Sequence, residues 1–192
     1  MIFTTTYEKE DTSLMAQLRE ANKYLPWINE AAEKYSIQPS IIAGLGSRES
    51  QWGLDLNPEG PSGTGDFTER RPKPPERPDK LPSDGLGFGR GLLQIDFDWH
   101  EFARSGKWMD PRENILYGCS ILRQTRANFL GFGDILREYG LLRAMLASFN
   151  AGTGNALRGM ALCLDVDTNT RGHNYSADVL NRAGWFQLQG WT

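Results

Sequence analysis

The stretch PSIIAGLGSRESQWG, residues 39–53, sets the fold that the rest of the chain must accommodate. Pro39 suits the first turn of a helix, and the apolar run after it predicts a buried helix that ends near Gly53. Three small residues of this run suit close packing against another helix: Ala43, Gly44 and Gly46. We therefore expect a helix that is enclosed by other helices.

The same helix carries a glutamate, Glu49, in its last turn. One interpretation is a solvated carboxylate paired with Arg48. In the other, Glu49 emerges from a core wall and Trp52, three residues along on the same helical face, shields it. A carboxyl against an apolar wall has its charged form disfavoured, so its pKa rises and it can donate a proton near neutral pH.

Length and composition favour one globular unit. The chain has 192 residues and 39% hydrophobic content, so we expect a single domain over residues 1–192. The net charge of −3 gives no electrostatic reason to expect nucleic-acid binding. No stretch approaches the roughly 18 apolar residues of a membrane span. Residues 1–25 are expected to form an N-terminal extension with one helix, and their start lacks the features of a signal peptide.

Periodic apolar residues and capping residues predict a mainly α fold with one small β element. At the start of the helix over 110–130, Asp110 is a good N-cap, and Glu113 completes a capping-box spacing. Further helices are predicted over 13–25, 26–36, 141–152, 153–164 and 174–186.

Residues 56–85 are dense in proline and glycine, which disfavours helix and central strand. A linker between domains is one interpretation. A long surface loop insertion is the better one, because too little chain precedes the segment for a separate domain and long loops are often functional.

A glycine-rich turn or short hairpin is predicted over residues 85–100. Alternation along Leu93, Ile95 and Phe97 leaves the intervening polar residues on the opposite face, where they could line a cleft. These residues are Gln94, Asp96 and Asp98. A glutamic acid opposite one or two aspartates is what glycosidic cleavage needs, with one group protonating the leaving oxygen and another balancing positive charge or activating water.

Cysteines and histidines give no metal signal. Cys119 and Cys163 lie in predicted helices among apolar neighbours, which favours buried free thiols over a single disulfide. No second Cys or His lies at ligand spacing, so metal binding is not expected. His100 is expected to orient the turn, and His173 has no assigned role.

Five motifs, in this order, together resemble the goose-type lysozyme and lytic transglycosylase superfamily over residues 26–186. They are ESQWG, GFGRGLLQID, DPRENILYG, ASFNAG and NYSADVLNRA. Each is weak alone, and the ordered set is specific. The resemblance implies a lysozyme-like α+β fold, in which a helical domain carries one small β-hairpin beside the active-site cleft.

The resemblance also implies site residues. Glu49 corresponds to the catalytic acid, and Tyr175 to a late tyrosine near it. The residues that line the substrate groove are implied to be Gly91, Leu92, Leu93 and Gln94. Those that hold the sugar beside the acid are implied to be Phe149, Asn150, Ala151 and Gly152.

Two aspartates and a histidine favour the goose-type branch of the superfamily, whose members hydrolyse the glycosidic bond with water. Asp84 and Asp96 match the two aspartates that transglycosylases lack, and His100 also matches. The long loop before Asp84 makes Asp66 a rival for its role. The chain also departs from the family pattern in two other ways. Phe149 replaces the usual tyrosine, and the basic surface that is common among wall-lytic lysozymes is missing.

The expected function is a muramidase that cleaves β-1,4 bonds between N-acetylmuramic acid and N-acetylglucosamine with inversion, without metal or organic cofactor. Glu49 would be the acid, assisted by Asp96 and Asp84. Gln94, Phe149, Asn150, Tyr175 and His100 are the candidate substrate-binding residues. Alternatives are a lytic transglycosylase, a chitinase and a non-catalytic glycan-binding module.

The expected partners are peptidoglycan or chitin-like strands, and the expected place of action is outside the cytoplasm. The oligomeric state is not readable from the sequence.

The sequence leaves alternative roles open for two tryptophans and for one arginine. Trp52 and Trp99 are the best candidates for stacking on sugar, although core packing is the more usual role of tryptophan. Arg90 could pair with Asp96 or Glu49, or be a surface cation.

Overall fold

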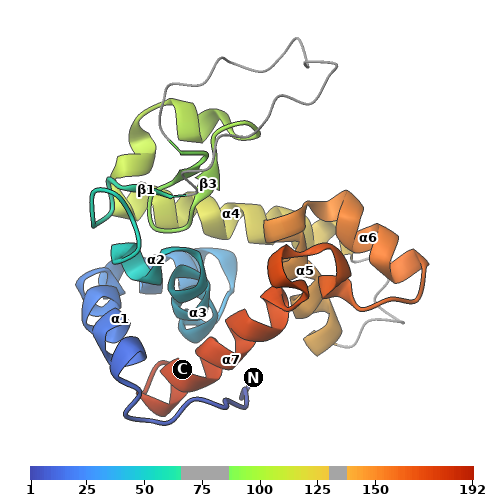
Figure 1. Cartoon of the computed structure of the whole chain (residues 1–192), viewed down its shortest axis with the longest axis horizontal. Helices are drawn as coiled ribbons and strands as arrows, with labels where there is room; N and C mark the ends of the chain where they lie inside the picture. The colour runs from blue at the N-terminus through green and yellow to red at the C-terminus, as the bar shows by residue number, and fades with distance from the viewer. Residues whose placement is uncertain (66–86, 130–137) are drawn as a thin grey trace.

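The structure is a computed structural model that describes residues 1–65, 87–129 and 138–192 (Figure 1). It is mostly helical and confirms the predicted mainly α class. Its α-helices are α1 Thr12–Lys23, α2 Leu25–Tyr35, α3 Pro39–Ser50, α4 Pro111–Phe129, α5 Glu138–Ala151, α6 Thr153–Ala161 and α7 Tyr175–Leu188. Short 3₁₀ turns connect them: η1 Gln51–Gly53, η2 Glu101–Arg104, η3 Lys107–Met109, η5 Val166–Asn169 and η6 Arg171–His173.

Helix α3 lies at the centre, in contact with α1, α2 and α7 (Figure 1). Its closest approach is to α7, and Gly44 is the reason. A Cβ at Gly44 would lie 2.5 Å from the carbonyl oxygen of Val179 and 2.9 Å from the amide nitrogen of Ala183. Only glycine lets the two backbones come so close. The predicted packing of small residues against another helix is thus confirmed at this position.

A small antiparallel sheet lies at one end of the molecule, with strand order β1-β2-β3. Strands β2 (Gly89–Arg90) and β3 (Ile95–Asp96) form the predicted hairpin. The edge strand β1 (Thr64–Gly65) was not predicted, because it comes from the proline- and glycine-rich segment. An edge position needs the fewest ladder bonds, so it tolerates such a sequence.

Asn114 of α4 joins this sheet to the helices. Its side-chain nitrogen donates to the carbonyl oxygens of Arg90 (3.0 Å) and Trp108 (3.2 Å), and its side-chain oxygen accepts from the amide of Leu93 (2.8 Å). The side chain is fully buried. One amide therefore fixes the turn between β2 and β3 against α4.

The start of α4 confirms the predicted N-cap. A side-chain oxygen of Asp110 accepts from the amide of Glu113 at 3.0 Å. The return bond of a capping box is not formed, because the amide of Asp110 donates to the carbonyl oxygen of Lys107 and Glu113 instead pairs with Arg112.

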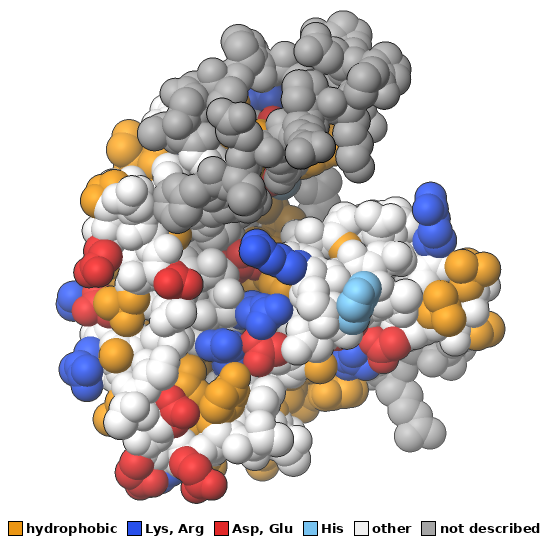
Figure 2. Space-filling model, viewed as in Figure 1, with side chains coloured by type: hydrophobic (Ala, Val, Ile, Leu, Met, Phe, Trp, Pro, Cys, Tyr) orange, Lys and Arg blue, Asp and Glu red, His pale blue; other side chains and the backbone are white. Residues whose placement is uncertain are grey.

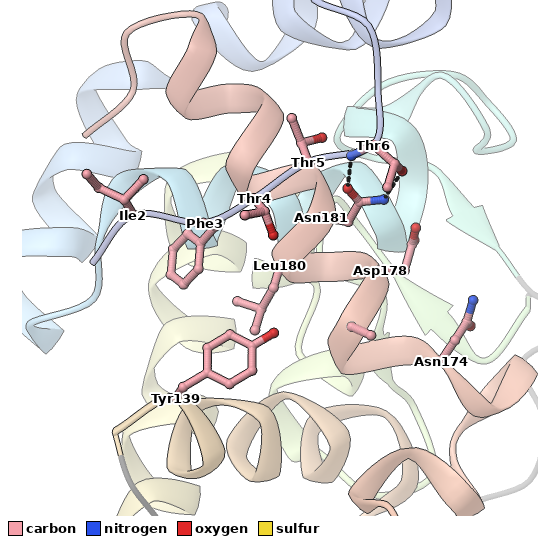
Figure 3. A pocket seen from close by; sticks show the side chains of 11 residues that line it. Ile2, Phe3, Thr4, Thr5, Thr6, Tyr139, Asn174, Asp178, Leu180 and Asn181 are labelled. Atoms are coloured by element: carbon pink, nitrogen blue, oxygen red, sulfur yellow. Dashed lines mark hydrogen bonds between the residues drawn. The ribbon is translucent and has the colours of Figure 1, made fainter.

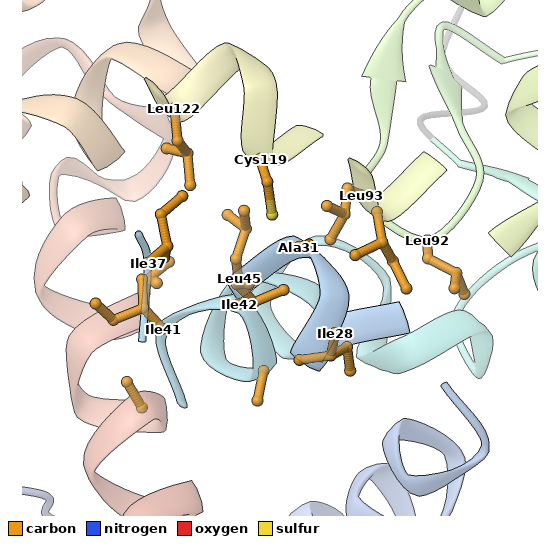
Figure 4. Packing of buried hydrophobic residues seen from close by; sticks show 14 of the residues in the cluster. Ile28, Ala31, Ile37, Ile41, Ile42, Leu45, Leu92, Leu93, Cys119 and Leu122 are labelled. Carbon is orange, nitrogen blue, oxygen red and sulfur yellow. The ribbon is translucent and has the colours of Figure 1, made fainter. Parts of the chain in front are cut away.

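The main hydrophobic core joins α2, α3, α4, α7 and the turn between β2 and β3 (Figure 4). Its centre includes Ile28, Ile42, Leu45, Leu93 and Cys119. A second, small cluster lies under α5 and α6, formed by Phe129, Ala144, Ala147 and Ala156. The second cluster lies where α4, α5 and α6 pack together.

The cysteine prediction is half right. Both thiols are free, and Cys119 is buried as expected. The burial predicted for Cys163 is wrong: it is exposed, because α6 ends at Ala161 and the chain turns there, with a φ of 56° at Cys163.

Most of the predicted loop insertion, residues 66–85, lies outside the described residues. The expected single domain over residues 1–192 stays a prediction. None of the helices that the structure describes is long and apolar enough to cross a membrane.

Candidate active site

Glu49 lies in the last turn of α3, where α7 begins beside it. The phenol of Tyr175, the first residue of α7, donates a hydrogen bond to the Glu49 carboxylate. The Tyr175 side chain is almost fully buried, whereas Glu49 keeps part of its surface open. The contact between α3 and α7 therefore brings together a buried phenol and an accessible acid.

The surroundings of Glu49 favour its protonated form. The pKa of Glu49 is raised from 4.5 to about 7, and burial is the largest cause. The hydrogen bond from Tyr175 and the cations of Arg48 and Arg171 lower the pKa, but by less than burial raises it. Glu49 can thus hold a proton near neutral pH, as its apolar setting in the sequence predicts.

The predicted shielding by Trp52 is wrong, because α3 ends before that residue. Ser50 is the last residue of the helix, and Gln51 and Trp52 both have positive φ angles, 51° and 58°. The chain turns back, so the indole nitrogen donates to the carbonyl oxygen of Ala43 (3.0 Å) and the ring lies over Gly46. Trp52 is fully buried, which also excludes it from stacking on a sugar.

The interpretation of Glu49 as half of an ion pair with Arg48 is also wrong. Arg48 turns to α7, where its Nη1 lies 3.0 Å from Oδ2 of Asp178. Its guanidinium lies over the ring of Tyr175, 5.7 Å from the centroid. The positive charge next to Glu49 in the sequence is therefore held by a different carboxylate.

The alternation predicted around β3 is confirmed. Leu93, Ile95 and Phe97 are buried, whereas the polar residues between them are partly exposed. Gln94 has a φ of 47°, and its side-chain nitrogen donates to the carbonyl oxygen of Gly91 at 2.8 Å. Its side-chain oxygen would lie within 2.2 Å of a Cβ at Gly65 or at Gly89, so the glycines make room for this amide on the sheet.

Asp96 and His100 form one turn. The amide of His100 donates to the carbonyl oxygen of Asp96 (3.1 Å), and Oδ1 of Asp96 accepts from the amide of Asp98 (2.8 Å). The His100 Nδ1 lies 3.2 Å from the Tyr117 hydroxyl. Burial lowers the pKa of His100, against the opposing effect of Asp96, so the ring is neutral at pH 7. This fits the expectation that His100 orients the turn.

The segment that the resemblance implies to hold the sugar lies at the C-terminal end of α5. Asn150 is exposed, and its side-chain oxygen accepts from the backbone amide of Arg171 at 2.8 Å. Phe149 is partly buried and packs against the main core. Asn150 thus holds η6 in place, and a role with sugar stays a prediction for both residues.

Arg90 is buried, so its interpretation as a surface cation is wrong. Its side chain is 1% exposed, and the guanidinium lies over the rings of Phe97 (4.7 Å) and Trp108 (5.8 Å). Aromatic faces attract a cation and cover its apolar stem. The predicted pairing of Arg90 with Asp96 or Glu49 stays a prediction.

Two of the predicted carboxylates, Asp84 and its rival Asp66, lie outside the described residues. Asp96 is the candidate for the second carboxylate that can be located. Trp99 is 58% exposed, as stacking on sugar would require.

Three charged residues near Glu49 were missed by the sequence analysis: Asp167, Arg171 and Asp178. Asp167 is buried and caps α7, accepting from the amides of Ser176 (2.8 Å) and Ala177 (3.2 Å). Arg143 pairs with it at 2.8 Å. These contacts join residues that are 9 to 24 positions apart in the chain, and no local spacing indicates them.

Figure 2 shows Lys and Arg side chains gathered in the middle of the face, beside the lobe of α6. Within residues 1–65, 87–129 and 138–192, no group of three or more His, Cys, Asp or Glu side chains could hold a metal ion. The located groups can donate a proton and bind polar groups of a ligand.

Comparison with known proteins identifies relatives along most of the chain, although no protein-family model matches it. A lysozyme g of Epinephelus coioides is 30% identical over 173 residues, which is 87% of this chain and 76% of that protein. The lysozyme g of Gallus gallus is 28% identical, over 91% of this chain and 68% of that protein. A membrane-bound lytic murein transglycosylase C of Serratia proteamaculans (strain 568) is 28% identical over 73% of this chain, but only 34% of its own length.

Proposed function

The chain belongs to the goose-type lysozyme family of glycoside hydrolases, and on that premise we propose that it is a muramidase. Its substrate is peptidoglycan, and the bond cleaved is the β-1,4 bond between N-acetylmuramic acid and N-acetylglucosamine. The observation that carries this proposal is the partly accessible Glu49, bonded to the phenol of Tyr175, whose pKa of about 7 lets it act as an acid.

Glu49 is the general acid in this proposal. Cleavage of a glycosidic bond leaves an alkoxide unless the leaving oxygen is protonated as the bond breaks. A carboxyl with a pKa near the working pH is protonated often enough to donate, and becomes a carboxylate that is stabilised by Tyr175. The hydrogen bond from Tyr175 strengthens as charge develops on Glu49, because it favours the ionised form.

Asp96, with Asp84, supplies the second carboxylate that the proposed hydrolysis needs. It lies on the partly exposed face of β3, where a carboxyl group can position water and balance positive charge on the sugar. Inversion requires that the two carboxyl groups stand about 6.5–9.5 Å apart to admit that water. We assign the hydrolytic water to this gap.

The sugar is held by Gln94, Asn150 and Tyr175, with Phe149 as an apolar wall. The Gln94 amide is held by its hydrogen bond to the carbonyl oxygen of Gly91, in the space that Gly65 and Gly89 leave, so it can bind a polar group of the substrate with little further loss of side-chain entropy. His100 keeps the Asp96 turn in shape.

Mass spectrometry of purified peptidoglycan after digestion tests the activity. A muramidase releases products with reducing ends. In Glu49→Gln, turnover should fall by several orders of magnitude while glycan binding persists. Glu33→Gln, at an exposed glutamate of α2, is the matched control and should retain full turnover. Unimpaired turnover by Glu49→Gln would contradict the proposal.

A lytic transglycosylase is the second candidate, and the murein transglycosylase relative is the observation that favours it. It needs the same acid but would give 1,6-anhydro ends in place of reducing ends. A chitinase would cleave chitin and leave peptidoglycan intact. A glycan-binding module would show no turnover with Glu49 or with Gln at this position.

The place of action follows from the proposed substrate. Peptidoglycan lies outside the cytoplasmic membrane, so we propose that the chain acts there, as one catalytic unit over residues 1–192.

A further inference from the structure

Asp178, in the first turn of α7, is shared by two arginines. Its Oδ2 lies 3.0 Å from Nη1 of Arg48 and 2.7 Å from Nε of Arg182. The hydroxyl of Tyr7 donates to Oδ1 at 3.2 Å. The carboxylate is 12% exposed, so these are shielded contacts that act more strongly than surface pairs do.

Arg48 is the residue directly before Glu49, yet all its described polar contacts lie toward α7 and η6. Besides Asp178, its Nη2 donates to the carbonyl oxygen of Arg171 and to the side-chain oxygen of Asn174, both at 3.4 Å. Its guanidinium lies on the face of Tyr175, the residue that donates to Glu49. The position of Arg48 therefore depends on the first turn of α7.

This position matters because a cation close to a carboxyl favours the charged form. Were Arg48 to pair with Glu49 directly, the acid would stay ionised at neutral pH and have no proton to donate. We propose that Asp178 is a positioning residue for the acid, because it holds Arg48 on the ring of Tyr175 and away from the Glu49 carboxyl. This inference depends on the proposed role of Glu49 as the general acid.

Within the part of the chain that the structure describes, few charged and titratable groups surround the two carboxylates. Glu49 is faced by Tyr175 from α7, by Arg171 from η6 and by Arg48 from its own helix. Asp178 is approached by Arg48 from α3, by Arg182 from its own helix and by Tyr7 from the N-terminal segment.

Arg182 and the N-terminal segment keep the arrangement rigid. Nη1 of Arg182 donates to the Ser47 hydroxyl at 2.9 Å, which ties α7 back to α3. Figure 3 shows the N-terminal segment running along α7, with Asp178 and Asn174 on the same side of the helix. Asn181 exchanges hydrogen bonds with Thr6 there, at 2.7 and 2.9 Å.

The variant Asp178→Asn tests the inference through the pH dependence of kcat/KM on peptidoglycan. The loss of the carboxylate frees Arg48 to approach Glu49, so the alkaline limb should move to lower pH by about one unit or more. Above pH 7 the rate should fall about tenfold for each pH unit that the limb moves, whereas near pH 5 it should return to the wild-type level.

The double variant Arg48→Gln/Asp178→Asn separates positioning from the charge of Asp178 itself. In the double variant no arginine can move towards Glu49. Its alkaline limb should therefore lie at the same pH as that of Arg48→Gln. Tyr7→Phe removes a neutral contact to Asp178 and leaves its charge, so this control should keep the wild-type limb. Thermal unfolding of each variant reports whether it is folded. If Asp178→Asn does not fold, Asp178→Ser replaces it in the test, because serine leaves room for a water molecule beside Arg182.

Three results would overturn the inference. The first is an alkaline limb that stays at the wild-type pH in both Asp178 variants, and the second is a movement of equal size in the Arg48→Gln background. A loss of activity that is uniform from pH 5 to pH 8 would indicate a merely structural residue and would also overturn it. Failure of the proposed function looks different, since either the wild type would show no turnover of peptidoglycan or Glu49→Gln would keep the wild-type turnover.

Discussion

At the scale of the residue, the protein depends on one carboxyl that is held between two opposing influences. Burial favours the protonated form of Glu49, while a phenol and two guanidinium groups favour the ionised form. The result is a pKa of about 7, where both forms are populated and the group can donate and recover a proton. Each contributor can be removed separately.

Tyr175→Phe removes the hydrogen bond that favours the carboxylate. The pKa of Glu49 should therefore rise further, and the alkaline limb of kcat/KM should move about one unit to higher pH, because a hydrogen bond to a charged group contributes about 1.5–3 kcal/mol. A pH profile of the purified variant measures this. Movement of the limb to lower pH would contradict the account.

The same pKa has a consequence for stability. Because the pKa of Glu49 is about 7 in the folded protein and 4.5 for the ordinary group, the wild type binds an extra proton on folding between these values. Glu49 therefore costs no stability below pH 4.5 and its full penalty above pH 7, up to about 3 kcal/mol.

Glu49→Gln should thus raise the free energy of unfolding by about 2–3 kcal/mol at pH 8, and by progressively less as the pH falls to 5. Urea unfolding at several pH values measures the difference, with Glu33→Gln as control. An advantage that is constant with pH, or absent at pH 8, would show that Glu49 has an ordinary pKa.

At the scale of the element, the site depends on how closely α3 and α7 approach. Gly44 allows the approach, and Asp167 caps α7 at the turn that carries Tyr175. Gly44 and the Asp167 cap lie at different places, yet both determine where the phenol of Tyr175 contacts Glu49.

Gly44→Ala should therefore destabilise the protein by about 1–3 kcal/mol, because the added Cβ would lie 2.5 Å from a backbone oxygen that cannot swing aside. Gly154→Ala is the matched control, since it is a helical glycine with no atom within 4 Å of the added Cβ. It should be neutral or stabilising by up to about 1 kcal/mol. Chemical denaturation measures both, and equal effects would refute the close contact.

At the scale of the whole molecule, the two cysteines report separately on the surface and the core. Cys163 is exposed at the end of α6, whereas Cys119 is buried among the helices of the main core, where burial raises the pKa of its thiol. A thiol reagent should modify one cysteine in the native state and the second only at the rate of unfolding.

Cys163→Ser provides the control for this measurement and should show no reaction before unfolding. Rapid reaction of two thiols in the native wild type would mean that the core around Cys119 opens readily, against the packing described.

Local rules predicted most of the helices and the setting of Glu49. Proline at the start of α3, the cap at Asp110 and the alternation around β3 depend on neighbours in the chain, so the sequence shows them directly. Prediction failed at Trp52, where two successive positive φ angles end the helix early.

Contacts between distant segments were also beyond local rules. Arg48 meets Asp178 130 residues away, and Arg90 is buried between rings that come from a turn and a 3₁₀ segment. Nothing in the immediate sequence of these arginines indicates which carboxylate or ring they contact, so only the fold could place them.

The pKa of Glu49 tests the central claim most directly. In protein labelled with ¹³C at the glutamate side-chain carboxyls, Glu49→Gln assigns the resonance, and a pH titration by NMR gives its midpoint. The account predicts a midpoint of about 7. A midpoint near the ordinary value of 4.5 would contradict it.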